Sequence, residues 1–446
     1  MPTLLPAPAS ASPAWLAALA AAGAAQFAAA GLPGRRSESW KYTNLETFGG
    51  IAFVPAVSCA LTRAEAEAFF IPGLDAVNLV FVNGVFRPDI SDEAAGLGAG
   101  IVCCPLSEAI AKHGALVEPH LGRLSAPAIT REGEAFTALN QAALGGAQSG
   151  GFFLHVPAGA AAGKPVHLLS VSTREGGVFA SHGRNLITAG SGARASFIEH
   201  YVTTDDAAAA TPSVYLHNCI TEIVAGQDAK VEHYLLEKDS VCAYNFSSLF
   251  IEQAEKSDVH SHTVLLGGKL VRNNVAPTLK GTAAHCLING LYVGRGSQLL
   301  DNAMRVHHGA PGCFSRQYYK GILCDASRGV FSGRIIVDQA AQKTDAIQQS
   351  RSMLLSDDAR VNTRPQLEIY ADDVRCTHGA TTGKVDEEAV FYFRSRGIPE
   401  AIARAMLVYA FAAEGFDRME LEPVRKLLAR EMIARLPMAA SLSIEV

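Results

Sequence analysis

A repeat in the second half of the chain most constrains its fold. Turn-like segments begin at Gly312, Arg328, Lys343, Asp358 and Asp373, which are steps of roughly 15 residues, and self-similarity of this kind is typical of a solenoid. A unit of that length cannot bury its own apolar face, whereas stacked units pair through their backbones and leave only two open ends. The repeat favours a parallel β-helix, although the spacing alone also allows a β-sandwich of short strands.

The repeat lies within a longer strand-rich region. From about Gly151 to Arg375 short runs rich in Val, Ile, Phe and Tyr alternate with Gly, Asn, Asp and Ser, a pattern that predicts many short strands. We expect three parts: an N-terminal helical and mixed region over 1–122, a β-helix core over 123–383 and a C-terminal helical domain over 384–446.

The predicted N-terminal region opens with an Ala-rich segment, Trp15 to Gly31, which carries no charge. It is short for a bilayer core and is interrupted by Gly23 and Gln26, so an ordinary helix is the better interpretation. Further along, Asn83-Gly84 indicates a hairpin and Leu106 to Leu116 resembles a helix.

The C-terminal part changes to a helical pattern after Gly383. Acidic residues from Asp386 and basic residues before Gly397 suit the two ends of a helix dipole. Second and third helices are expected to begin at Pro399 and after Pro423. The second is predicted to bury Ile402, Met406, Leu407 and Ala410, and the third Val424, Leu427, Leu428 and Met432.

The composition excludes several classes of protein. With 49% hydrophobic and 18% charged residues the chain is predicted to fold into a large core, and a formal charge of −5 without a basic tract argues against nucleic-acid binding. Nine cysteines without a regular framework indicate reduced thiols and a cytoplasmic location. No positively charged signal-like start is present, and no membrane association is expected.

Cys376 and His378 are the candidate site residues, at the junction between the strand-rich and helical parts. Residues two apart on a strand project to the same face, so a thiol and an imidazole would lie side by side as metal ligands. A small buried thiol next to a hydrogen-bonded histidine fits the spacing equally well.

The wider segment carries a resemblance. The run Cys376–Gly383, CTHGATTG, followed by DEEAVFYFRSRGI, closely resembles the C-terminal signature of the SufB/SufD family, scaffold proteins of the SUF iron-sulfur cluster assembly machinery. Further similar segments are Ser37–Thr43 with its Trp-Lys-Tyr core, Leu354–Asp357 and Asn362–Ile369. The resemblance therefore extends over nearly the whole chain.

Two positions favour the SufD branch of this family. The SufB pattern has a functional cysteine just before its Ser-Met-Leu, whereas this chain has Ser350 in that region and cannot supply the thiolate there. The SufB signature also reads His-Glu where this chain has His378-Gly379. A SufB-like primary cluster scaffold is thus the weaker alternative.

The resemblance implies a right-handed parallel β-helix core flanked by helical regions. It also implies a non-catalytic scaffold that pairs with a SufB paralogue and binds the SufC ATPase through the C-terminal helices, with a homodimer as the alternative for the isolated chain. An iron-sulfur cluster generally needs four ligands, so we expect Cys376 and His378 to form half of a composite site for a transient cluster or iron at the SufB interface. No tightly bound cofactor is expected in the isolated chain.

Other chemistry is absent from the sequence or weakly indicated. No P-loop, Gly-x-Ser-x-Gly or His-Glu-x-x-His motif occurs, and 7% aromatic residues with scattered acids argue against a β-helix enzyme acting on polysaccharide. His307 and His308 are expected on opposite faces of a strand, with one able to approach Cys313 or Cys324 only if the coils align. Three more histidines stay unassigned: His260 and His262, which share a face, and His233.

Overall fold

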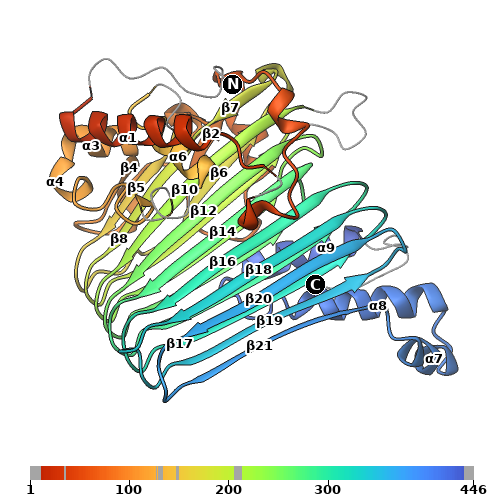
Figure 1. The fold of residues 1–446 in the computed structure, drawn as a ribbon. Helices are drawn as coiled ribbons and strands as arrows, with labels where there is room; N and C mark the ends of the chain where they lie inside the picture. Colours follow the sequence, from red (N-terminus) through yellow and green to blue (C-terminus); the bar gives the residue numbers. More distant parts are fainter. Residues whose placement is uncertain are drawn as a thin grey trace.

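The computed structural model describes residues 12–34, 37–126, 128, 134–146, 150–204 and 213–435. The outermost parts of the predicted terminal regions, 1–11 and 436–446, lie outside the described residues. The core is a parallel β-solenoid in which successive strands alternate between two facing sheets, as Figure 1 shows. The predicted β-helix with helical regions at both ends is therefore confirmed.

Each coil contributes one strand to each sheet, so the step of roughly 15 residues is half a coil. In the first sheet the strands lie in the order β20 (Arg360–Ile369), β18 (Arg328–Val337), β16 (Leu299–His308), β14 (Leu270–Leu279), β12 (Tyr244–Gln253), β10 (Tyr215–Ala225), β8 (Arg184–Ala189), β5 (Phe152–Val156) and β4 (Val102–Pro105), with β1 (Val54–Pro55) and β7 (Phe179–Ser181) beside this series. In the second sheet the order is β21 (Arg375–Gly383), β19 (Asp345–Leu354), β17 (Phe314–Leu323), β15 (His285–Gly294), β13 (Asp258–Leu265), β11 (Lys230–Lys238), β9 (Arg194–Thr203), β6 (Val166–Ser172), β2 (Val77–Val82) and β3 (Val85–Phe86).

The main core lies between the two sheets. Alternate residues of each strand point inward, and apolar side chains such as Val231, Val259, Ile288 and Phe331 are fully buried there. Tight turns join the strands, and several of them place a residue other than glycine in the left-handed region, including Asp228 with φ 55° and Lys343 with φ 61°. These less favourable backbone angles occur in the turns, so the strands between them remain long and regular.

The N-terminal region covers one end of the solenoid. Its helices are α1 (Ala14–Ala30), η1 (Glu38–Trp40), η2 (Phe48–Gly50), α2 (Arg63–Glu67), η3 (Pro88–Ile90), η4 (Ala94–Leu97), α3 (Leu106–Lys112), α4 (Gly114–Val117) and α6 (Ala135–Ala142), while η5 (Arg174–Gly176) follows β6. Strands from before residue 123 join both sheets, since β2 pairs with β6 and β4 with β5. The predicted hairpin at Asn83-Gly84 connects β2 and β3, with φ values of 51° and 80°.

Helix α1 confirms the interpretation of the uncharged segment as a packed helix. It ends at Gly31, and Leu16 and Phe27 are buried. Gly23 lies so close to α6 that a Cβ there would be 2.6 Å from the backbone nitrogen of Ala142. Within the described ranges no helix is both long and apolar enough to span a bilayer.

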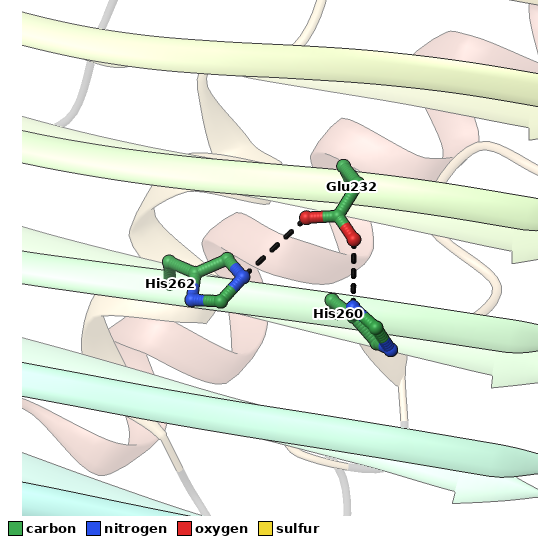
Figure 2. A group of neighbouring side chains, drawn as sticks. All are labelled: Glu232, His260 and His262. Atoms are coloured by element: carbon green, nitrogen blue, oxygen red, sulfur yellow. Dashed lines mark ion pairs between the residues drawn. The ribbon is translucent and has the colours of Figure 1, made fainter. Parts of the chain in front are cut away.

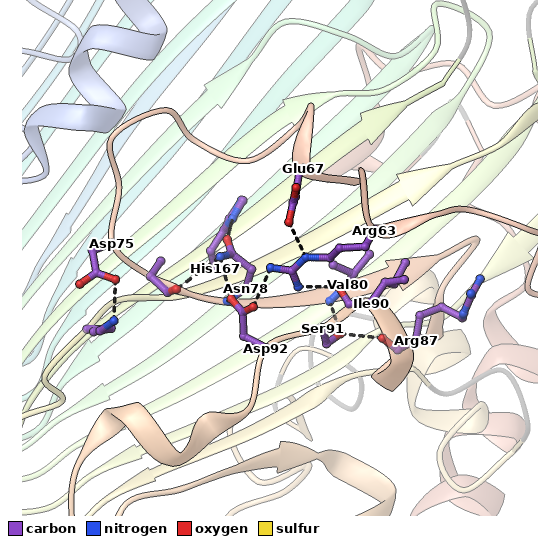
Figure 3. A network of polar contacts seen from close by, with 12 residues as sticks. Arg63, Glu67, Asp75, Asn78, Val80, Arg87, Ile90, Ser91, Asp92 and His167 are labelled. Atoms are coloured by element: carbon purple, nitrogen blue, oxygen red, sulfur yellow. Dashed lines mark hydrogen bonds and ion pairs between the residues drawn. The ribbon is translucent and has the colours of Figure 1, made fainter. Parts of the chain in front are cut away.

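A polar network attaches the N-terminal region to the second sheet (Figure 3). Asp92 accepts hydrogen bonds from Arg63 at 2.8 Å and from the backbone and side chain of Asn78, each at 2.8 Å. The Asn78 side-chain oxygen lies 2.8 Å from Nδ1 of buried His167 on β6. These contacts fix β2 to the solenoid at its first coils.

Three helices follow the last strand: α7 (Glu387–Ser395), α8 (Glu400–Ala413) and α9 (Glu422–Arg435). The predicted starts of α7 and α8 are confirmed, whereas α9 begins at Glu422, before Pro423 rather than after it. Asp386 caps α7 by accepting from the backbone N–H groups of Glu388 and Ala389 at 2.9 and 3.3 Å. The buried side chains of α8 and α9 form one cluster with the outer face of the second sheet, including Tyr234, Leu236 and Val264.

The predicted buried face of α8 was only partly correct: Leu407 is partly buried against this cluster, but Met406 and Ala410 are exposed. Its fully buried residues are Ala403, Ala405, Val408 and Ala412, whereas Met406 is exposed. Small side chains let the helix lie close to the sheet, so the Ala-rich side packs and the bulkier Met406 faces outward. The prediction for α9 was largely correct, since Val424, Leu428 and Met432 are buried.

Candidate functional site

Cys376 and His378 lie on the last strand of the second sheet. Within the described ranges strand β21 pairs with β19 alone, and Cys376 stands opposite Ala346 and His378 opposite Gln348. Ala346 and Gln348 are buried inward-facing residues. The register therefore confirms that Cys376 and His378 share a face, which is the inner face of the solenoid at its open end.

Among the described residues, no further coil covers this inner face. His378 is exposed, whereas Cys376 is half-buried and packs against a small apolar cluster that includes Ile335 and Ala346. Burial raises the pKa of the Cys376 thiol, a backbone hydrogen bond from Ala346 opposes the rise, and the charge of Asp345 adds to it. The thiol is thus neutral at pH 7 and becomes a thiolate only when a cation or another donor approaches.

Ser350 belongs to the same inner face. It stands opposite Ala380 on β21 and is buried. The structure therefore groups Ser350, Cys376 and His378 on the last two strands of one sheet. Within the described part of the chain, no third metal-binding side chain completes a cluster with Cys376 and His378, so this chain supplies two donors at most.

A second group of ligand-type side chains lies on the outer face of the second sheet, and Figure 2 shows how it converges. Glu232 on β11 stands opposite His260 on β13, and His262 follows two residues later. Glu232 Oε1 is 2.7 Å from His260 Nδ1, and Oε2 is 3.4 Å from His262 Nε2. The sequence showed that His260 and His262 share a face but gave no reason to add Glu232. A separation of one coil, 28 residues from Glu232 to His260, is the signal that would have found it.

This group is strongly polarised. Burial by itself raises the pKa of Glu232, but hydrogen bonds from His260 and His262 outweigh it and lower the pKa to about 2. Burial lowers the pKa of His260, whereas its contacts with Asp258 and Glu232 outweigh this and raise it to about 10. Without an added ion the group is therefore an ion pair between Glu232 and a protonated His260.

The remaining histidines have structural partners. His307 faces outward with Nε2 2.9 Å from Asp338, while His308 is buried with Nε2 2.9 Å from Ser315 Oγ, which confirms that they lie on opposite faces. The thiol of Cys313 donates to the carbonyl of Gly281. Neither histidine joins Cys313 or Cys324 in a ligand cluster of the described residues.

His233 lies inside the solenoid. Its Nε2 is 3.0 Å from Glu199 Oε1, and its Nδ1 is 3.0 Å from Ser261 Oγ. Both ring nitrogens are thus occupied by buried partners. All nine cysteines are free, as expected for reduced thiols.

Comparison with known proteins agrees with this architecture. Residues 171–411 match the family described as SUF system FeS cluster assembly, SufBD core domain, and residues 9–168 match the SufBD protein N-terminal region. The chain is 33% identical to the iron-sulfur cluster assembly protein SufD of Escherichia coli strain K12, over 92% of this chain and 91% of that protein. A SufBD family iron-sulfur cluster assembly protein of Synechocystis is 32% identical over 87% and 84% of the two chains.

A more distant relative is the SufD protein of Bacillus subtilis strain 168, 26% identical over 74% of this chain and 72% of that protein. The two matched regions together span both the N-terminal cover and the solenoid with most of α8. The chain belongs to the SufBD family of iron-sulfur cluster assembly proteins and is of the SufD type.

Proposed function

We propose that this chain is a non-catalytic scaffold subunit that pairs with a SufB paralogue, binds the SufC ATPase and helps to build a transient iron-sulfur cluster or acquire its iron. The observation that carries the proposal is the uncovered inner face of the last coil, where Cys376 and His378 lie on an edge strand. Nine free thiols suit a reducing compartment, and we place the protein in the cytoplasm on that ground.

The donor set supports a composite site. A cluster generally needs four ligands, and two side chains with a neutral thiol cannot hold one alone. The unpaired edge of β21 can accept a strand of a second β-helix, which would bring the partner's thiolates next to His378. In this arrangement His378 is the primary ligand or proton acceptor and Cys376 supports it. The isolated chain then holds no tightly bound cofactor, and its edge is free to form a homodimer.

The C-terminal helices support the part of the proposal that concerns SufC. Helices α7 and α8 expose large apolar side chains: Phe391 is 71% exposed, Tyr392 56% and Met406 37%. Adjacent exposed aromatic residues are characteristic of protein interfaces. ATP hydrolysis by the partner would move these helices, which pack directly on the outer face of the second sheet.

The decisive test combines assembly with cluster formation. The chain is co-expressed with its cognate SufB-like and SufC-like proteins, and the mass of the purified assembly is measured by light scattering. The complex is then supplied with iron and sulfide without oxygen. We expect His378→Ala to leave the assembly intact and to lower the cluster content about tenfold, the scale on which loss of a metal-binding contact acts.

His307→Ala is the matched control, because His307 is also a solvent-accessible strand histidine but lies on an outer face away from the last coil. It is expected to retain full cluster content. An unchanged cluster yield in His378→Ala would refute the ligand role, and a chain that ignores both partners would refute the scaffold role.

A further inference from the structure

The outer-face group formed by Glu232, His260 and His262 has the composition of a metal centre. The ligand atoms of these three side chains all lie within 4.8 Å of one another, and no other such cluster occurs among the residues that the structure describes. We propose that Glu232, His260 and His262 bind a divalent first-row transition metal ion, with Zn²⁺ and Fe²⁺ as the candidates. Two imidazoles with one carboxylate are a donor set that suits both ions.

The strand register fixes this geometry. Glu232 and His260 are direct neighbours across the β11 and β13 ladder, and the pleat places His262 on the same face. Tetrahedral donors bound at about 2.0–2.1 Å are about 3.3 Å apart. Glu232 Oε1 lies 2.7 Å from His260 and Oε2 lies 3.4 Å from His262, on either side of this value, and the three ligand atoms lie within 4.8 Å of one another. Side-chain rotations that draw the two imidazoles together would therefore enclose an ion.

Each proposed ligand has an outer partner that would orient it. The far nitrogen of His260, Nε2, is 3.1 Å from Asp258 Oδ1. The far nitrogen of His262, Nδ1, is 3.2 Å from the side-chain nitrogen of Asn289. Tyr234 donates to Glu232 Oε2 at 3.1 Å. Metal-binding histidines characteristically donate their second ring N–H to a carboxylate or carbonyl oxygen, and the Asp258–His260 contact has that form.

The Asn289 amide fits the same scheme after one rotation. Its side-chain oxygen is buried and has no hydrogen-bond partner in the described structure. Turning the amide by 180° lets this oxygen accept from His262 Nδ1–H, which leaves the lone pair of Nε2 directed at the ion. The rotation satisfies the unpaired oxygen and selects the tautomer that a metal requires.

The proposed centre is accessible and separate from the last coil. The side chains of His260 and Glu232 are 23% and 13% exposed, so a water molecule can reach the remaining coordination position. Strand β13 is separated from β21 by β15, β17 and β19, a distance of about 19 Å at the usual spacing of 4.7–4.9 Å between strands. The proposal therefore stands independently of the role of Cys376 and His378.

The test uses the full chain, stripped of metal and titrated with Co²⁺ under anaerobic conditions, with visible absorption as the signal. We expect one ion per chain at this site. Glu232→Gln, His260→Gln and His262→Gln are each expected to weaken binding at least tenfold, and Asp258→Asn by about 10–100-fold through the outer contact. Displacement of Co²⁺ by Zn²⁺ or by Fe²⁺ then identifies the preferred ion.

Two controls separate this site from others. His307→Gln changes an outward histidine with its own carboxylate partner, and Cys376→Ser/His378→Ala removes the last-coil pair; both are expected to keep the full Co²⁺ signal. At the same Zn²⁺ concentration the ion should also raise the thermal midpoint of the unaltered chain, and should raise that of Asp258→Asn by less, because this variant keeps all three proposed ligands but binds the ion more weakly. Absence of stoichiometric binding, or binding that the ligand variants and Asp258→Asn leave unchanged, would overturn the proposal.

Discussion

At the scale of single residues, one buried ion pair joins the N-terminal region to the solenoid. Glu222 on β10 accepts from the guanidinium of Arg184 at 2.7 Å and from the backbone N–H groups of Gly122, Leu124 and Ser125 at 2.8, 3.0 and 3.0 Å. Both charged side chains are fully buried. The Glu222 carboxylate thus provides an acceptor for four hydrogen-bond donors that are buried away from water.

Glu222→Gln is expected to lower the free energy of unfolding by about 3–5 kcal/mol, because it leaves the Arg184 charge buried without its counter-ion. Urea unfolding measures the change. The double variant Arg184→Met/Glu222→Gln should recover part of the loss, since it removes the uncompensated charge. A double variant less stable than both single variants would contradict this account.

A second prediction at the scale of residues concerns the stability of the fold at low pH. The bidentate contact with Arg123 lowers the pKa of Glu252 from 4.5 to about 2, with burial opposing and Lys280 adding to the shift. The folded-state pKa lies below the unfolded value, so this stabilisation is complete above about pH 4.5 and is lost as the pH falls through about 2. Glu252→Gln should therefore reduce the loss of stability between pH 5 and pH 2, measured as the change in the urea midpoint. Glu255→Gln changes an exposed pair with Lys256 and should not alter this change in the urea midpoint.

At the scale of elements, the segment from Glu38 to Thr43 attaches the N-terminal region to the first sheet. Trp40 is buried, its ring centroid is 5.4 Å from Phe136, and the guanidinium of Arg272 lies 4.1 Å above the ring. Arg272 also donates to Ser39 and Asp301, and Thr43 donates to Asp301 at 2.5 Å. Within the Trp-Lys-Tyr motif Trp40 is therefore the packing residue, whereas Lys41 and Tyr42 are exposed.

Trp40→Ala is expected to cost about 3–5 kcal/mol, the usual range for deleting a buried aromatic side chain. Native-state hydrogen exchange should show the loss locally, at the amides of Trp40 and Thr43, which are bonded to Ser37 and to the Trp40 carbonyl. Tyr42→Ala is the control in the same motif, because Tyr42 is 38% exposed. Equal protection in both variants would show that Trp40 does not hold this segment against the sheet.

The sequence predicted elements whose signals are local. The caps and charges at Asp386, Pro399 and Gly31 marked real helix ends, and the repeat marked real half-coils. It failed where packing depends on residues far along the chain. The buried side of α8 depends on how closely a helix can approach the second sheet. Glu232 joins His260 only through strand register, which no local pattern encodes.

At the scale of the whole molecule, the solenoid has one covered and one open end. The N-terminal region covers the first coils, whereas β20 and β21 are the last strands of their sheets in the part of the chain that the structure describes. The candidate pair, Cys376 and His378, lies at the open end. The fold thus places its exposed backbone edge and its two candidate ligand side chains together.

This arrangement predicts how pairing can be blocked. The Arg375 N–H donates to the carbonyl of Thr344, the residue just before β19, so by alternation the N–H of Ala380 points toward the open edge. Ala380→Pro removes that donor without breaking the ladder to β19, a position where edge strands tolerate proline. We expect an unchanged far-UV circular dichroism spectrum but loss of pairing with a second β-helix subunit in light scattering. Ala380→Ser should pair normally; a proline variant that still pairs would exclude β21 as the contact.

The order of the coils also has a consequence for synthesis. Each coil pairs with the coil before it, so a chain emerging from the ribosome can stack its coils in the order in which they are translated. The apolar strip of Tyr234, Leu236 and Val264 is different, because α8 and α9 cover it and are translated last. Throughout translation of the later coils this strip faces the solvent and any chaperone that meets the nascent chain, and a chain that stalls before residue 400 keeps it exposed.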